Sequence, residues 1–243
     1  SMDADCPPKP FGGPEEFTFA PDDLSIIFTA KDANREEAWS TNFDLYAAPV
    51  EGDSPPLNLT DPNNAWDTAP TFSPNGKLAY LAMSRPGYEA DRYKIIVKAS
   101  PAANSLSITN DWDRSPGAIA WSADEMSIYA TADNLGQHSL FEVNVATNAV
   151  KTIVQDGNIS GFQVAGDRIV FLMDHLKSPA ELYTVKPDGS DLKQITKINE
   201  EKIAAARMGD FEQFSFKGWR DETVYGYVVK PVDFDGSKKY PVA

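Results

Sequence analysis

The chain has 243 residues and a formal net charge of −14, from 22 basic and 36 acidic side chains. This acidic balance argues against nucleic-acid binding and against electrostatic attachment to an anionic membrane. One cysteine excludes an intrachain disulfide framework and any multi-cysteine metal site, and two histidines leave little material for a histidine metal centre. We expect neither a metal site nor a cofactor.

No apolar run approaches the roughly 18 residues of a membrane span, so we expect a soluble chain. The start of the chain, Ser1-Met2-Asp3-Ala4-Asp5, is polar and acidic, unlike a signal peptide. We expect the natural N-terminus to lie elsewhere, and the cellular compartment stays open.

After a lead-in over residues 1–16, one sequence pattern recurs four times. The clearest copy begins Pro70-Thr71-Phe72-Ser73-Pro74-Asn75-Gly76, and each copy continues with two apolar runs and a short final segment, which in its usual form ends in Thr. Asn-Gly predicts a hairpin, because type I′ turns need positive φ at both central residues. The copies occupy residues 17–60, 61–109, 110–154 and 155–197.

Each copy supplies four short strands at a period of roughly 40 to 55 residues, which is typical of propeller blades. A β-sandwich with an accidental repeat is the alternative. We favour the propeller because the turn motif recurs in register with the strand that ends in Thr. The predicted fold is therefore all-β, with about four four-stranded blades of a partial β-propeller.

The period breaks after the fourth copy. Residues 198–211 have helix-forming composition and are predicted to form a linker with a helical turn. Residues 212–243 contain two alternating runs, 214–219 and 224–231, which predict a β-hairpin from a different layer.

Several stretches together resemble the propeller of the prolyl oligopeptidase family of serine peptidases, in the branch of acylaminoacyl peptidases and dipeptidyl-peptidase V. They are 35–46, 85–92, 178–183, 214–219, 227–231 and 238–242. The resemblance implies an α/β-hydrolase domain with a Ser-His-Asp triad beyond Ala243, begun by the hairpin at 212–243. The chain would then be the C-terminal half of a propeller that gates and positions peptide substrates.

The chain contains neither the Gly-x-Ser-x-Gly of a nucleophile elbow nor a His-Gly-Gly run. We therefore expect no catalytic residue in it and no activity of residues 1–243 alone. The expected partners are peptide substrates, the chain's own hydrolase domain and, through truncated blade flanks, a second copy as a homodimer. The competing hypothesis is a standalone propeller that serves as a protein-binding scaffold.

Two long charged loops, 32–42 and 84–91, are predicted to leave the same face of the propeller. Acidic side chains there could neutralise a substrate ammonium, and arginines could bind a peptide carbonyl or carboxylate. Alternatively, these are solvated loops whose charges pair with each other. The candidates for substrate binding are Glu36, Glu37, Arg85, Glu89 and Arg92.

Overall fold

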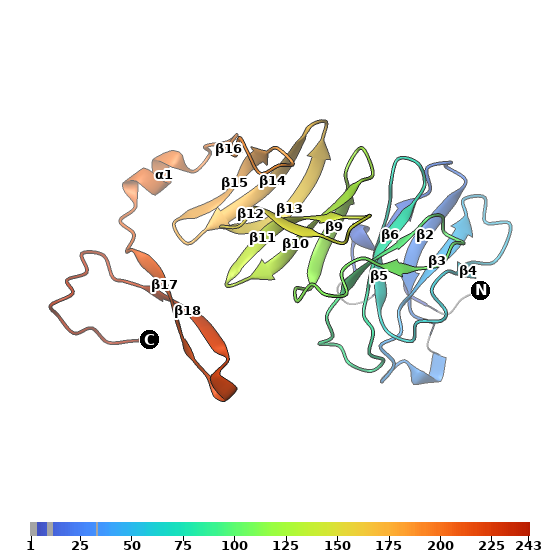
Figure 1. The fold of residues 1–243 in the computed structure, drawn as a ribbon, viewed down its shortest axis with the longest axis horizontal. Helices are drawn as coiled ribbons and strands as arrows, with labels where there is room; N and C mark the ends of the chain where they lie inside the picture. Colours follow the sequence, from blue (N-terminus) through green and yellow to red (C-terminus); the bar gives the residue numbers. More distant parts are fainter. Residues whose placement is uncertain (1–3, 9–11, 33) are drawn as a thin grey trace.

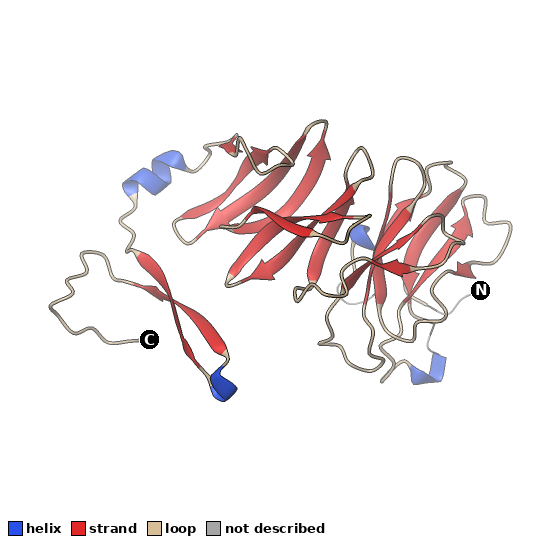
Figure 2. Cartoon of the chain, in the orientation of Figure 1, coloured by secondary structure: helices blue, strands red, loops and turns tan. Residues whose placement is uncertain are grey.

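The computed structural model describes residues 4–8, 12–32 and 34–243, and it is built mainly from β-strands (Figure 2). Parts of the expected lead-in, 1–3 and 9–11, lie outside the described residues. The predicted linker contains one short α-helix, α1 (Glu200–Ala205), and single 3-10 turns occur at Pro14–Glu16, Asn34–Glu36 and Trp219–Asp221. In the described part of the chain, no helix is long and apolar enough to cross a membrane.

The four sequence copies form antiparallel units of four strands each. The first unit is β1 (Phe17–Phe19), β2 (Ser25–Ala30), β3 (Asp44–Pro49) and β4 (Leu57–Asn58). The second is β5 (Asp67–Phe72), β6 (Leu78–Ala82), β7 (Lys94–Lys98) and β8 (Leu106–Ser107). Both pair in sequence order, so each turn joins two neighbouring strands.

The third and fourth units follow the same plan but share one eight-stranded sheet. The third is β9 (Pro116–Trp121), β10 (Ser127–Asn134), β11 (Gln137–Asn144) and β12 (Val150–Val154). The fourth is β13 (Asn158–Ala165), β14 (Arg168–His175), β15 (Ser178–Val185) and β16 (Lys193–Gln194). One parallel pair, His138 with Asn158, connects them. The sequence pattern did not predict this junction.

The core lies between neighbouring units rather than inside any one of them. Successive side chains of a strand point to opposite faces. In β6, Tyr80 therefore packs with Ile27 and Leu45 of the first unit, whereas Leu81 packs with Ile128 of the third. This position between two neighbours explains why every residue of β6 is buried.

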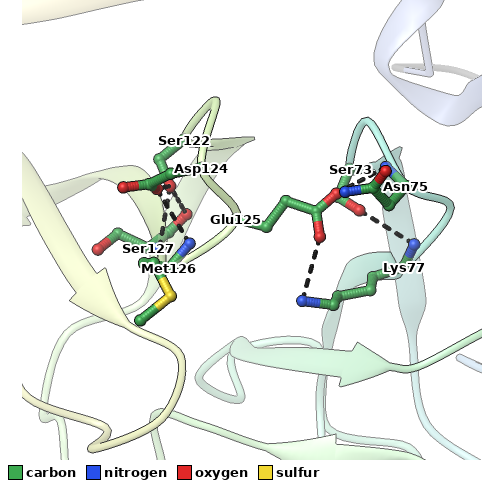
Figure 3. Close-up of polar contacts among 8 residues, drawn as sticks. All are labelled: Ser73, Asn75, Lys77, Ser122, Asp124, Glu125, Met126 and Ser127. Carbon is green, nitrogen blue, oxygen red and sulfur yellow. Dashed lines mark hydrogen bonds and ion pairs between the residues drawn. The ribbon is translucent and has the colours of Figure 1, made fainter.

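The units follow one another along an arc in chain order (Figure 1). Their first strands lie next to each other, because β1 contacts β5, β5 contacts β9, and β9 contacts β13. The turns between first and second strands also meet. Glu125 of the third unit contacts Asn75 and Lys77 of the second (Figure 3).

The threonine that ends a copy ties its unit together. The hydroxyl oxygen of Thr60 accepts a hydrogen bond from the Leu45 amide at 3.0 Å, and Thr109 accepts one from Ile95 at 2.8 Å. In the fourth unit, Thr196 plays the same role toward the amide of Leu182 at 2.9 Å.

A separate two-stranded sheet follows α1, formed by β17 (Phe211–Lys217) and β18 (Thr223–Val229). It confirms the predicted hairpin, and Arg220 lies in the turn between the strands. The hairpin contacts the β10–β11 turn through polar groups: Gln137 Nε2 donates to Tyr227 Oη at 2.5 Å, and Gln213 Nε2 donates to the Leu135 carbonyl at 2.7 Å.

Candidate functional site

The two loops singled out from the sequence lie against each other. One joins β2 to β3 and the other joins β6 to β7, and the Gly87 amide donates a hydrogen bond to Thr41 Oγ1 at 2.8 Å. Together they line a cavity of about 530 Å³, whose walls include Asp32, Glu36 and Trp39. Residue 33, inside the first loop, lies outside the described residues.

The first loop turns sharply at Glu36, which ends the 3-10 turn Asn34–Glu36. The Glu36 carbonyl accepts hydrogen bonds from the amides of Trp39 at 3.0 Å and Ser40 at 2.8 Å. These bonds fix the backbone of Glu36 at the cavity wall. The Trp39 side chain is 71% exposed, an unusual position for so large an apolar group.

Glu36 and Glu37 are adjacent in the sequence but have different surroundings. Glu37 Oε1 lies 3.1 Å from Lys31 Nζ, which also donates to the Glu37 carbonyl at 2.8 Å. Lys31 lies over the ring of Phe43, with Nζ 5.3 Å from the ring centroid. Glu36, in contrast, makes no ion pair with any residue in the described ranges. Of the two carboxylates, Glu36 lines the cavity and keeps an unpaired charge.

The second loop braces itself through Arg85 and Asp91. Arg85 Nη2 lies 2.7 Å from Asp91 Oδ1, and the other carboxylate oxygen accepts the amides of Ser84 and Arg85 at 2.9 and 3.0 Å. Burial alone would raise the pKa of Asp91, but the bonds from Arg85 and the backbone amides lower it to about 2. Arg85 also stacks at 4.0 Å on the ring of Tyr88, so its guanidinium is already engaged.

The remaining two candidates lie away from the cavity wall. Glu89 is exposed near the tip of the second loop. The guanidinium of Arg92 donates to the carbonyls of Thr109 and Asn110, each at 3.0 Å, and to that of Trp112. Arg92 therefore holds the connection between the second and third units. Of the five residues singled out from the sequence, the cavity includes Glu36.

Other residues of the cavity wall were not candidates from the sequence, among them Asp32 and Asn42. Asp32 belongs to the first loop, and the presence of a second acidic residue close to Glu36 in the sequence could have indicated it. Asn42 gave no signal, because its role depends on burial: its Oδ1 is buried and has no hydrogen-bond partner among the described residues, while its Nδ2 donates to Asp44 at 3.2 Å. The cavity thus combines two carboxylates with a spare acceptor and suits a cationic group.

The described residues contain no group of three or more His, Cys, Asp or Glu side chains that could hold a metal ion. The cavity wall offers carboxylate, amide and hydroxyl groups.

Comparison with known proteins gives a consistent set of relatives. No protein-family model matches the chain. It is 28% identical over 257 residues to dipeptidyl-peptidase 5 of Aspergillus fumigatus, a match that covers 98% of this chain and 35% of the relative. The chain therefore spans about a third of the length of such curated relatives.

Solved structures agree on the fold. The acylaminoacyl peptidase of Pyrococcus horikoshii matches with a TM-score of 0.70 at 19% identity, over 95% of this chain and 35% of that one. The β-propeller domain of the Trilobed protease from Pyrococcus furiosus matches with a TM-score of 0.57 at 17% identity, over 78% of this chain and 57% of that domain. The serial four-stranded units thus resemble those of propellers.

Proposed function

We propose, from the premise that this chain belongs to the prolyl oligopeptidase family of serine peptidases, that it forms part of the propeller of a dipeptidyl or acylaminoacyl peptidase. Dipeptidyl-peptidase 5 matches nearly the whole chain, and the four-stranded units succeed one another as blades do. On this proposal the units at 17–60, 61–109, 110–154 and 155–197 are blades, and 198–211 is a linker.

The hairpin at 212–243 is then the first element of an α/β-hydrolase domain. Its strands β17 and β18 form a sheet of their own, separate from the four units, and side chains on them such as Phe214 and Phe216 are exposed. Apolar side chains of this kind would find their packing partners in further elements of that domain. The Ser-His-Asp triad would belong to the same domain.

The propeller's contribution is to hold the substrate, and the loop cavity is the candidate place. The observation that supports this role is the unpaired carboxylate of Glu36 on the cavity wall, next to the exposed ring of Trp39. A peptide N-terminus is an ammonium at neutral pH, and a carboxylate stabilises it by a charge-assisted hydrogen bond. An exposed tryptophan face attracts a cation as well. We therefore assign the cavity to the free N-terminus of a peptide.

The test is a titration of the chain with Ala-Ala-amide at low salt, in which NMR or calorimetry measures the binding. We expect binding that Glu36→Gln weakens about tenfold, the loss of one charge-assisted contact. Glu37→Gln is the matched control, because Glu37 is already paired with Lys31 and should leave the affinity nearly unchanged.

N-acetyl-Ala-Ala-amide, which lacks the ammonium, should bind less tightly than the free dipeptide. Equal binding of the two peptides would refute an ammonium site. Equal effects of the two glutamate substitutions would also refute it and would return these loops to the role of solvated surface.

A further inference from the structure

A second and larger cavity lies between the first and second units, apart from the loop cavity. Its volume is about 740 Å³, within the range of small-molecule sites. One wall is the segment after β4, with Leu59 and Thr60, and the other is the face of β7 and β8 that carries Lys94, Lys98 and Ser107.

Two lysines give this cavity a positive character in a chain of net charge −14. The Lys98 side chain is 5% exposed and donates one hydrogen bond, from Nζ to the Leu59 carbonyl at 2.9 Å, so two of its three N–H groups remain available. Lys94 has neither an ion pair nor a side-chain hydrogen bond with any described residue. A buried ammonium group without an anion is costly, so Lys98 would gain from one, and the half-buried Lys94 lies on the same wall.

The acidic residue on the wall does not cancel this charge. Asp67 is fully buried, and burial raises its pKa to about 8, so at pH 7 the carboxyl is mostly neutral. Burial lowers the pKa of Lys98, and an anion beside that amine would favour the charged form.

The wall also holds two buried polar atoms that lack a hydrogen bond within the described part of the chain. Asp67 Oδ2 and Ser107 Oγ are buried and have no hydrogen-bond partner among the described residues. A buried polar group without a partner costs free energy, and most such groups in folded proteins are paired. A protonated Asp67 and the Ser107 hydroxyl can each donate a hydrogen bond to an oxyanion.

We propose that this cavity binds a small organic oxyanion, with Lys94 and Lys98 as its charged contacts and Ser107 as a hydroxyl donor. The volume of about 740 Å³ exceeds what a bare phosphate fills, and hydroxyl and amide side chains such as Ser105 and Asn104 suit a hydroxylated body. The ligand class is therefore a carboxylate or phosphate on a sugar-sized molecule.

Calorimetric titration of the chain at pH 7 and low salt tests the proposal with four probes: inorganic phosphate, glucose 6-phosphate, gluconate and neutral glucose. We expect one or both hydroxylated anions to bind and glucose not to bind. Binding of the phosphate ester alone, or of the carboxylate alone, identifies the anionic group. Absence of binding by glucose 6-phosphate and by gluconate overturns the proposal.

Variants locate the binding. Lys94→Gln should weaken the affinity about tenfold, whereas Lys186→Gln, which removes an exposed lysine of the fourth unit, should leave it unchanged. Equal losses in these two variants would mean general attraction to positive charge and would overturn the site. A substitution of Lys98, such as Lys98→Met, could disturb a buried position and is therefore not used. Ser107→Ala is the second variant instead, and near-UV circular dichroism verifies its fold.

Discussion

The carboxylate of Glu125, in the turn of the third unit, lies 3.1 Å from Nζ of Lys77 in the turn of the second, and accepts the Asn75 amide at 2.6 Å (Figure 3). Glu125 has φ of 58°, where the equivalent residue of the second unit is Gly76 with φ of 85°. A left-handed conformation is costly for a residue with a side chain. The contact to the neighbouring unit explains why a glutamate occupies this position.

This relationship predicts a pH-dependent loss of stability in Glu125→Gln. Hydrogen bonds from Ser73 and Asn75, with Lys77 close by, lower the pKa of Glu125 from 4.5 to about 2. The stabilisation is therefore present above pH 4.5 and is lost as the pH falls toward 2. We expect the variant to melt at a lower temperature than the parent at pH 7, with the difference shrinking by pH 3. A constant difference in Tm would contradict this assignment.

The threonine that closes the first unit should be worth more than a surface hydroxyl. Thr60 is buried, accepts the Leu45 amide and donates to Asp44 Oδ1, each at 3.0 Å. Thr60→Val leaves both groups unsatisfied, so we expect the free energy of unfolding to fall by about 1–3 kcal/mol. Urea denaturation measures this free energy. The control Thr152→Val, at an exposed position of β12, should change the free energy of unfolding by no more than about 0.5 kcal/mol.

Thr152 also marks where the sequence pattern stopped being informative. In the usual form of the repeat a threonine ends the copy, and the first, second and fourth units have such a closing threonine. In the third unit the bond runs in the opposite direction, because Ser139 on β11 donates to the carbonyl of Gln155 at 2.5 Å. Hydroxyl groups can donate as well as accept, so either strand can carry the closing side chain. Periodicity alone does not distinguish them.

The candidate site was predictable at the level of loops but not of single charges. Long charged insertions at the same place in two consecutive copies must meet if the copies stack, and the contact of Gly87 with Thr41 agrees. Which carboxylate stays without an ion pair depends on where Lys31 reaches, and it reaches Glu37 rather than Glu36. Arg92 was equally unpredictable, because its three carbonyl partners come from a turn about 20 residues away.

Asp67 should make the chain less stable as the pH rises. Its pKa is raised from 3.8 to about 8, mainly by burial and further by the nearby charge of Asp44. The hydrogen bond from Asn63 and the positive charge of Lys98 act in the opposite direction and lower the pKa. Folding therefore favours the protonated form, and the stability present below pH 3.8 is lost as the pH rises toward 8.

Relative to Asp67→Asn, which cannot ionise, the free energy of unfolding of the parent should fall by about 1.4 kcal/mol per pH unit in this window. Urea denaturation at pH 5, 6, 7 and 8 compares the two chains, with Asp61→Asn as an exposed control. Parallel pH profiles for the parent and Asp67→Asn would show that the carboxyl is ionised when folded.

The 243 residues alone should not hydrolyse dipeptidyl or acylaminoacyl chromogenic substrates. They contain no Gly-x-Ser-x-Gly, and loss of a triad removes most of a serine peptidase's rate enhancement.

The described part of the chain does hold one histidine–aspartate pair, His138 Nδ1 with Asp133 Oδ1 at 2.8 Å, but this is a cross-strand pair of β10 and β11. Near Gly117 the ring of His138 shares its surroundings with the hydroxyl of Thr131, which is buried and does not belong to a nucleophile elbow. We therefore expect no labelling by a fluorophosphonate probe and identical background for His138→Ala. Labelling of a serine, abolished in His138→Ala, would reveal a catalytic centre within this chain.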